Sequence, residues 1–433
     1  MTKRVLIITY YWPPSGGSGV QRWLKFVKYL PQFGWEPFVF TPENPAFSIQ
    51  DKSLLNDVPA QVEVVRFPIW EPYQLFQRLA SFFSGKKMQP MDLVATGRKT
   101  FIQKFGMWIR ANFFIPDARR FWIKPSVEYL SDFVQRNQID KIITTGPPHS
   151  MHLIGRNLKR KNQALHWVAD FRDPWSEWDL LDTLRVSGWA RNKHKRMEAS
   201  VLREADRVLT VTPYYVKQFK HLGAKSAELI TNGFDEDDFK SIQHHRTASF
   251  TVRHMGGVDE LRDPRPVMVA IKNLCLLKPD FREAVKVEFI GTVNSSFKEF
   301  VANDEVLAAC VNFMSHIPHN ELMKTYETTD LLLLILAHAA HAKGNIPGKL
   351  FEYLASGNEV LGVGASDGDS AKLLTEAGAG SVVDASDQEG LETALWKSFL
   401  NWKAGAKPDR KTITEYSRRV LTMRLVTLLE QLP

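Results

Sequence analysis

The sequence predicts two α/β domains, each built on a doubly wound parallel sheet, and three observations support this fold class. Short apolar runs alternate with segments of helical periodicity along the chain, which is typical of parallel sheets with helical crossovers. This alternation starts twice, at residues 5–9 and again at residues 250–255, and a glycine-rich loop follows each start. The 433 residues also exceed the size of one compact core. We therefore expect two similar domains that face a central cleft.

The N-terminal domain is expected over residues 1–235. Residues 5–9 are an apolar run of the kind that is buried in a parallel sheet, and a glycine-rich loop follows at residues 13–19. Apolar residues then recur at helical spacing, at Val20, Trp23, Leu24, Val27 and Leu30. The same alternation predicts further strands at residues 38–41, 62–65, 141–145, 166–170 and 207–211.

The second half of the chain repeats this architecture after a linker. Residues 236–249 are polar and lack apolar periodicity, which indicates the linker. The C-terminal domain is expected over residues 250–410, with strands at residues 250–255, 287–291, 312–314, 331–335 and 360–363. Residues 411–433 contain a helical pattern, and we expect this C-terminal helix to pack back on the N-terminal domain.

Composition and charge indicate the class of protein, its compartment and the charge of its partners. Hydrophobic residues make up 44% and charged residues 24%, as in globular proteins. Two cysteines do not make a disulfide framework, and no apolar run approaches the roughly 20 residues that span a bilayer. The protein is thus expected in the cytoplasm or at the inner face of the plasma membrane. The net charge of +8 favours an anionic partner, whether a nucleotide-linked sugar, a lipid surface or nucleic acid.

Residues 67–125 form a basic-aromatic region that departs from the strand–helix alternation. Between Arg98 and Lys124 there are seven Lys and Arg residues and a single acid, Asp117, mixed with large aromatic side chains. This mixture suits the headgroup zone of an anionic membrane. The alternative is a helical insertion whose aromatic residues join the core. Nothing else in the sequence supports a nucleic-acid partner.

The stretch from Asn345 to Gly357 carries the strongest functional signal. A loop with Ile346 and Pro347 runs into a short helix, and such a helix N-terminus lies at the carboxyl edge of a doubly wound sheet. Backbone N–H groups and the helix dipole there suit a phosphate. Glu352 lies about one turn into the helix, where a carboxylate can accept hydrogen bonds from a ribose diol. The alternative is an ordinary connection in any sheet of this kind.

The loop at residues 13–19 is not a dinucleotide fingerprint. Gly17 and Gly19 fit the spacing G-x-G-x-x-G, but Arg22 stands where the third glycine belongs, and no Gly-Lys-Ser/Thr follows. The glycines, Gly16 and Gly17 among them, permit close backbone approach to a ligand. The alternative is a tight turn.

These motifs together resemble family 4 of the retaining glycosyltransferases with two Rossmann-like domains, the GT-B fold. The loop at residues 13–19 resembles the family's first loop, and residues 230–239 resemble the segment that closes its N-terminal domain. Residues 254–264 resemble the loop that opens the donor domain, and residues 345–357 resemble the donor-binding segment. The resemblance implies transfer of a sugar from a nucleotide-diphospho-sugar to a glycan or lipid-linked acceptor in surface polysaccharide biosynthesis.

The resemblance also implies roles for single residues. The donor would contact Gly16, Gly17, Gly256, Gly257, Arg262, Ile346, Pro347, Gly348, Lys349 and Glu352. Arg262 would neutralise the charge that develops on the leaving diphosphate, and Lys349 would share that role. The family's first glutamate is replaced by Gly344, which puts the identity of the donor sugar in doubt.

In the N-terminal domain the candidate residues follow two strands. Asp170, Arg172 and Asp173 lie at a strand end, and Arg172 takes the place where many relatives carry a histidine. They are expected to orient the acceptor hydroxyl or the donor phosphate, as catalytic residues. His149, in another strand-to-helix loop, is an acceptor-binding candidate with Arg172. The alternatives are a buried Asp–Arg structural pair and a packing role for His149.

The sequence offers no convincing metal site, and neither a metal nor another cofactor is expected. The histidines lack the spacing of a ligand set, and no Ser/His/Asp or Cys/His set suggests a protein nucleophile. Two alternative functions remain: a nucleotide-sugar 2-epimerase of the same fold, or a catalytically silent nucleotide-sugar-binding protein.

Overall fold

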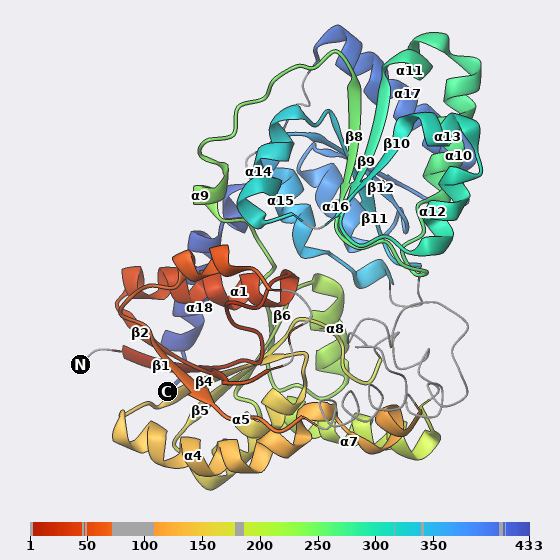
Figure 1. The fold of residues 1–433 in the computed structure, drawn as a ribbon. Coiled ribbons are helices and arrows are strands. Elements are labelled where there is room, and N and C mark those ends of the chain that lie inside the picture. The colour runs from red at the N-terminus through yellow and green to blue at the C-terminus, as the bar shows by residue number, and fades with distance from the viewer. Residues whose placement is uncertain are drawn as a thin grey trace. The chain divides into compact units, whose positions relative to one another are not determined.

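The computed structural model describes residues 3–45, 47, 50–71, 108–177, 186–315, 317–338, 342–406, 410–411 and 413–433. The chain divides into two compact units. The N-terminal unit consists of Met1–Thr231 and Arg419–Pro433, and the C-terminal unit consists of Asn232–Arg418. Figure 1 colours the chain from red at the N-terminus to blue at the C-terminus. Within the described ranges no helix is long and apolar enough to cross a membrane.

The N-terminal unit contains a parallel sheet of seven strands in the order β3-β2-β1-β4-β5-β6-β7. The strands are β1 (Lys3–Ile8), β2 (Trp35–Pro42), β3 (Glu63–Phe67), β4 (Lys141–Gly146), β5 (His166–Phe171), β6 (Arg207–Thr210) and β7 (Ala227–Leu229). The helices are α1 (Ser18–Tyr29), α4 (Ile123–Arg136), α5 (Ser150–Lys161), α7 (Gly188–Glu204), α8 (Pro213–His221) and α18 (Arg418–Glu430). Short 3-10 turns lie at η1 (Leu30–Phe33), η2 (Lys52–Asp57) and η3 (Ala118–Trp122).

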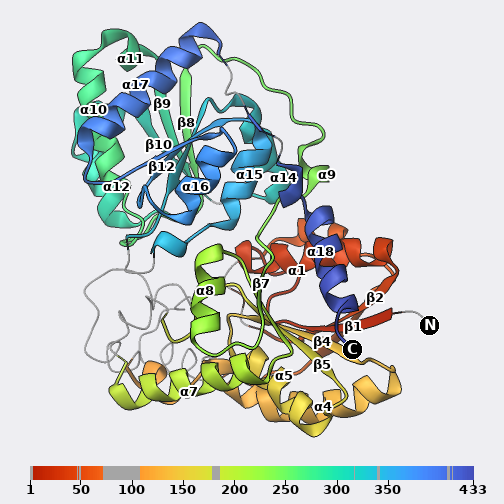
Figure 2. The same cartoon turned by 180° about the vertical axis from the view of Figure 1, so that it is seen from behind.

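Helices cover both faces of this sheet (Figures 1 and 2). Val5 and Ile7 of β1 pack with α1 and α18, whereas Leu6 and Ile8 pack with α4, α5 and α7. Side chains alternate between the two faces of a strand, so a strand covered on both sides must be apolar throughout. This explains the continuous apolar run that begins the sequence.

The C-terminal unit contains a parallel sheet of six strands in the order β10-β9-β8-β11-β12-β13. The strands are β8 (Phe250–Met255), β9 (Val285–Ile290), β10 (Val311–Met314), β11 (Leu331–Ile335), β12 (Glu359–Val363) and β13 (Gly380–Val383). One face packs with α10 (Arg265–Leu277), α11 (Pro279–Ala284), α12 (Ser295–Ala302), α13 (Glu305–Cys310) and α17 (Gln388–Ala404). The other face packs with α14 (His319–Thr325), α15 (Gly348–Ser356) and α16 (Asp369–Glu376).

The remaining elements of the C-terminal unit are short. The segment that was predicted to be a linker begins with α9 (Glu236–Phe239). Single 3-10 turns lie at η4 (Tyr326–Thr328), η5 (Ala342–Gly344) and η6 (Thr414–Tyr416). The two parallel sheets with helices on both faces confirm the predicted fold class, two Rossmann-like α/β units.

Each strand order reverses direction at one point, which locates the expected ligand sites. In the N-terminal unit the reversal lies between β1 and β4, and in the C-terminal unit it lies between β8 and β11. Ligands of doubly wound sheets bind outside the carboxyl ends of the strands at such a switch point. The loops that follow β1 and β4, and those that follow β8 and β11, are therefore the regions in which to look for a site.

Candidate functional site

In the C-terminal unit, glycines bring the loop after β8 close to its neighbours. Gly256 has φ +122° and Gly291 has φ +134°, in a region that L-residues rarely adopt. A Cβ atom on Gly291 would lie 2.5 Å from the carbonyl oxygen of Gly256, and a Cβ atom on Gly256 would lie 3.2 Å from Nζ of Lys349. Side chains at these positions would thus obstruct the loop and the amine of Lys349.

Helix α15 is held against the end of β8 by two side chains one turn apart. Lys349 Nζ donates to the carbonyl oxygen of Met255 at 2.9 Å, and the N–H of Met255 donates to the hydroxyl of Tyr353 at 3.0 Å. Residues four apart share a face of a helix, so both backbone groups of Met255 are bound by one face of α15. This contact fixes the N-terminus of α15 beside the loop at residues 256–257.

The amine of Lys349 lies in an unusual electrostatic environment. Burial lowers the pKa of Lys349 to about 7, and the charge of Arg262 acts in the same direction, while Glu352 and Asp259 oppose the shift. His254, which is fully buried, places its Nε2 atom 3.4 Å from Lys349 Nζ. Lys349 can therefore gain or lose its charge near neutral pH.

Glu352 lies on α15, one turn after Lys349. The Tyr326 hydroxyl donates a long hydrogen bond of 3.5 Å to Glu352 Oε2. Burial raises the pKa of the Tyr326 phenol well above its ordinary value, so Tyr326 remains a donor at neutral pH. The carboxylate of Glu352 is half-buried.

Arg262 pairs with an acid on its own loop. Its Nη1 lies 2.7 Å from Asp259 Oδ2, and the Arg262 side chain is 40% exposed. An exposed ion pair of this kind contributes at most about 1 kcal/mol, so Arg262 can leave Asp259 for another anion at small cost. The diphosphate role of Arg262 remains a prediction.

The other predicted donor residues lie just before or at the start of α15. Ile346 is buried in the core of the unit, Pro347 is the N-cap residue of α15, and Gly348 begins the helix. Gly344, which stands where the family has a glutamate, is the last residue of η5. These residues shape the N-terminus of α15, whereas Lys349 and Glu352 supply the side-chain chemistry.

In the N-terminal unit, Asp170 is fully buried and accepts hydrogen bonds from three side chains. Arg22 Nη2 lies 2.9 Å from its Oδ1, Trp23 Nε1 donates to its Oδ2 at 2.7 Å, and the Thr145 hydroxyl donates at 3.0 Å. Burial alone would raise the pKa of Asp170, but the charge and hydrogen bonds of Arg22 outweigh it and lower the pKa. Arg22 stands where the third glycine of a G-x-G-x-x-G motif would be, and the sequence did not predict it as a partner of Asp170. Asp170 thus holds α1 in place through Arg22 and Trp23, and its catalytic role remains a prediction.

Arg172 connects the first turn of α1, which follows β1, with the end of β4 and the loop after it. Its guanidinium donates to the carbonyl oxygens of Gly19 at 2.8 Å, Pro147 at 2.5 Å and Gly146 at 3.3 Å. Gly19 follows β1, whereas Gly146 and Pro147 belong to the end of β4 and its loop. Arg172 thus fixes the first turn of α1 relative to the loop after β4. Any contact that it makes with an acceptor remains a prediction.

His149 is buried at the start of α5 and stacks on Trp175, with ring centroids 4.7 Å apart. Neither ring nitrogen has a hydrogen-bond partner in the described part of the protein. Burial, with the nearby charges of His152, His194 and Arg172, keeps the pKa of His149 well below its ordinary value. A neutral imidazole with unpartnered nitrogens suits a hydroxyl group of a ligand.

The remaining predicted residues of this unit lie beside Arg172 and in the first loop. Asp173 is exposed one position after Arg172. Gly16 is half-buried, and Gly17, with φ +86°, is the exposed N-cap residue of α1. A Cβ atom on Gly17 would meet no atom within 4 Å, so its positive φ is the reason for glycine there. Their ligand contacts remain predictions.

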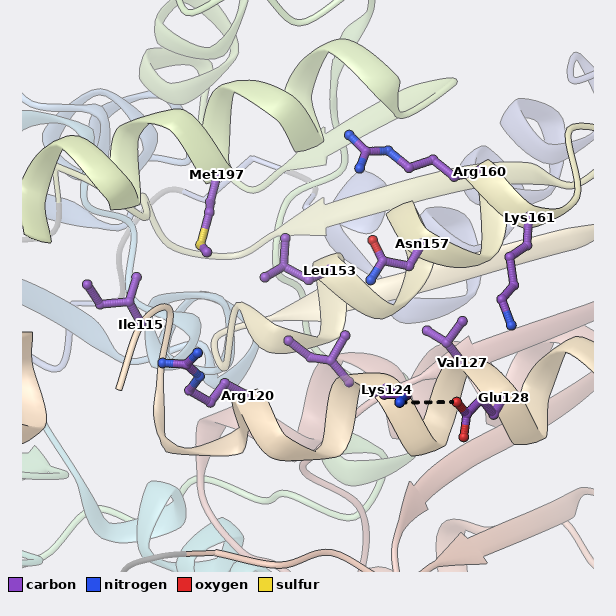
Figure 3. Close-up of a pocket in the computed structure, with 11 residues that line it drawn as sticks. Ile115, Arg120, Lys124, Val127, Glu128, Leu153, Asn157, Arg160, Lys161 and Met197 are labelled. Carbon is purple, nitrogen blue, oxygen red and sulfur yellow. Dashed lines mark ion pairs between the residues drawn. The ribbon is translucent and has the colours of Figure 1, made fainter. Parts of the chain in front are cut away.

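A separate cavity of about 530 Å³ lies between α4, α5 and α7 (Figure 3). Its floor is apolar and includes Val127, Leu153 and Met197. Four basic residues and one acid surround this floor: Arg120, Lys124, Arg160, Lys161 and Glu128. Lys124 lies 3.9 Å from Glu128, and Arg160 pairs with Glu204 at 2.6 Å. Part of the basic-aromatic region, residues 72–107, lies outside the described residues.

Metal binding finds no support in the described ranges. There, no group of three or more His, Cys, Asp or Glu side chains is arranged to hold an ion. Metal independence nevertheless remains a prediction.

Comparisons with known proteins agree on the fold. A family model for the glycosyl transferase 4-like domain matches residues 16–233. Sucrose-phosphate synthase from Thermosynechococcus elongatus has a similar structure, with a TM-score of 0.64, 13% identity and 99% coverage of both chains. A trehalose-6-phosphate protein from E. coli, bound with UDP-2-fluoro glucose, has a TM-score of 0.60, 12% identity and full coverage of both chains. WaaG, a glycosyltransferase involved in lipopolysaccharide biosynthesis, has a TM-score of 0.53, 14% identity and coverage of 99% of this chain and 95% of its own. No curated protein sequence matches the chain significantly.

Proposed function

The chain belongs to the glycosyl transferase 4-like family and is a glycosyltransferase of the GT-B fold, and on this basis we propose that it transfers a sugar, with retention, from a nucleotide-diphospho-sugar to a glycan or lipid-linked acceptor. One observation carries the proposal. Lys349 and Glu352 project from the first turns of α15, beside the glycine loop at the switch point of the C-terminal sheet. A cation and a carboxylate one turn apart fit a diphosphate and the ribose next to it.

The chemistry of this site is leaving-group stabilisation. When the bond between the sugar and the diphosphate breaks, negative charge builds up on the diphosphate. Lys349, the N-terminus of α15 and a rearranged Arg262 would stabilise that charge. Orientation of the acceptor hydroxyl would fall to His149 and to the loops that Arg172 holds. In this mechanism, no side chain of the protein acts as a nucleophile.

Stabilisation by nucleotides tests the donor site. We expect one of UDP, GDP, ADP and dTDP to raise the midpoint of thermal unfolding clearly above the others. A ligand at one hundred times its Kd stabilises by about 2.7 kcal/mol, and each kcal/mol shifts the midpoint of a unit of this size by about 2–4 °C. No response to any of the four would contradict the proposal.

A turnover assay separates the candidate enzyme classes. With the sugar ester of the selected diphosphate, slow hydrolysis without acceptor should release free nucleoside diphosphate. An epimerase would instead return a nucleotide-sugar with an inverted centre, and a silent binding protein would release nothing. WaaG, which has a similar fold, is involved in lipopolysaccharide biosynthesis, and this motivates surface glycans as the first acceptors to test.

We also propose that the protein works at the inner face of the plasma membrane, with the N-terminal unit in contact with anionic lipid. The cavity between α4, α5 and α7 supports this, because basic side chains surround an apolar floor. Phe113 and Phe121, at the described end of the basic-aromatic region, are 55% and 44% exposed. Exposed aromatic rings beside basic residues suit an interface with anionic headgroups.

Vesicle binding tests this membrane contact. Vesicles that contain phosphatidylglycerol should bind the protein more strongly than vesicles of phosphatidylcholine. Each basic residue near the surface contributes about 1 kcal/mol, so reversing two charges should weaken binding by about thirtyfold or more. The test variant is Lys124→Glu with Lys161→Glu, and the control is Lys286→Glu with Lys397→Glu, at exposed sites of the C-terminal unit. Equal losses in both double variants would show a general charge effect and no specific surface.

A further inference from the structure

We propose that His254 is a positioning residue that acts through Lys349, and that binding of a diphosphate at the loop of residues 256–257 takes up a proton. The inference rests on the proposed function, since it requires a diphosphate at that loop. It goes further, because it assigns a role to a buried histidine and predicts how donor binding depends on pH.

The tautomer of His254 follows from its surroundings. Its Nδ1 atom lies 3.0 Å from the carbonyl oxygen of Leu333, and a carbonyl can only accept a hydrogen bond. The backbone of Gly257 also hydrogen-bonds with the ring. We assign the hydrogen to Nδ1, which faces the Leu333 carbonyl, and this assignment leaves the lone pair on Nε2. Nε2 lies 3.4 Å from Nζ of Lys349, so the imidazole accepts from the amine. The Leu333 carbonyl thus orients the imidazole of His254, and the imidazole in turn orients the amine of Lys349.

The amine of Lys349 retains one hydrogen for a ligand. As an ammonium group it has three N–H donors. One is directed to the carbonyl oxygen of Met255 at 2.9 Å and one to His254 Nε2. The third is available beside Gly256, where a Cβ atom would stand 3.2 Å from Nζ. Glycine at this position therefore leaves a phosphate oxygen room to reach the ammonium.

The charges around Lys349 decide when it is protonated. Arg262 disfavours the ammonium, whereas Asp259 and Glu352 favour it, and burial brings its pKa to about 7. His254 on β8 stays neutral because burial and the neighbouring Lys349 keep its pKa well below its ordinary value. The phenols of Tyr326 and Tyr353 also stay neutral, since burial raises the pKa of each. Near neutral pH, Lys349 is thus the group of this cluster that titrates.

The direction of the linkage follows from these charges. A bound diphosphate adds negative charge beside the amine and raises the pKa of Lys349. Above the free pKa of Lys349 the amine is neutral in the free protein and charged in the complex, so binding takes up a proton. At pH 6 the ammonium is already present and almost no proton is taken up. Affinity therefore falls as pH rises through the free pKa of Lys349.

Isothermal titration calorimetry measures this proton directly. The probe is the glucose ester of the diphosphate chosen by thermal shift, such as UDP-glucose, because its phosphates do not titrate near neutral pH. Titrations at pH 8 in HEPES and in Tris, which differ in ionisation enthalpy and carry no phosphate to compete for the site, should reveal net proton uptake. Lys349→Met should abolish this uptake. Binding without proton uptake at pH 8 would overturn the inference, whereas no binding of any probe would instead overturn the proposed function.

Two substitutions of the histidine test the positioning role. In His254→Asn the side-chain amide can still donate to the Leu333 carbonyl, but no acceptor is left at the position of Nε2. In His254→Gln the longer side chain can place an acceptor there. We expect the asparagine variant to bind the probe about two- to tenfold more weakly at pH 7, and the glutamine variant to recover most of this loss. Equal affinity in both variants and the native protein would overturn the role of His254, and if neither variant folds, the native and Lys349→Met titrations still decide the proton uptake.

Discussion

Replacing Asp170 with asparagine is expected to destabilise the N-terminal unit by about 3–5 kcal/mol, because it leaves the buried charge of Arg22 without a counterion. The side chains of both residues are at most 1% exposed, so water cannot replace the lost carboxylate. Trp23 and Thr145 would also lose their charged acceptor. The substitution should therefore loosen α1, and with it the glycine loop that precedes this helix.

Hydrogen exchange measures the effect within one unit. Peptides from β1 and β5 should exchange faster in Asp170→Asn, while peptides from β8 serve as an internal reference. Asp173→Asn is the matched control, because the same chemical change falls on an exposed carboxylate at the end of the same strand, and surface changes usually cost less than about 0.5 kcal/mol. Adding Arg22→Met to Asp170→Asn should restore part of the stability. If the two asparagine variants behave alike, the ion pair does not hold this unit together.

The direction of the pKa shift of Asp170 determines how the stability of the Asp170–Arg22 pair depends on pH. Arg22 and the hydrogen bonds lower the pKa of Asp170 below its ordinary value of 3.8, although burial opposes them. A carboxyl whose pKa is lower in the folded state stabilises the fold above its unfolded pKa. This contribution is lost as pH falls through the folded pKa, so acid weakens the pair only below pH 3.8.

Local patterns in the sequence predicted most of the strands but missed two at the edges of the sheets. The central strands β1 and β11 are apolar throughout because helices cover both their faces, and this run is visible in the sequence. Ala227–Leu229 (β7) has only three residues, and Gly380–Val383 (β13) includes an exposed serine and a glycine with φ +150°. Edge strands are short and only partly covered, so their apolar signal is weak.

The candidate sites were predictable as residue types at strand and helix ends, but their contacts were not. Lys349 and Tyr353 stand one turn apart in the sequence, yet their common target, Met255, lies nearly a hundred residues earlier. Arg22 pairs with Asp170 across 148 positions. Local patterns carry no information about such partners, because the fold of the whole unit brings them together.

Replacing Glu352 with alanine is expected to weaken nucleoside diphosphate binding by roughly tenfold to a hundredfold. A carboxylate on α15 can accept two hydrogen bonds from the ribose diol, and hydrogen bonds to charged groups contribute about 1.5–3 kcal/mol. The C-terminal unit should remain folded, because Glu352 is only half-buried and the hydrogen bonds of Tyr353 and Lys349 with Met255 still hold α15 in place. Glu299→Ala, an exposed glutamate on α12, is the matched control and should bind like the native protein.

A deoxy ligand shows whether the lost contact is the one with ribose. If UDP is the selected diphosphate, the native protein should bind 2′-deoxy-UDP clearly more weakly than UDP. The alanine variant should no longer distinguish the two ligands, because the acceptor for the 2′-hydroxyl is gone. Tyr326→Phe removes the donor at 3.5 Å without removing the carboxylate, so a smaller loss there would indicate that the phenol only orients Glu352. An affinity of Glu352→Ala within about twofold of the native value, or about 0.4 kcal/mol, would mean that the ribose binds elsewhere.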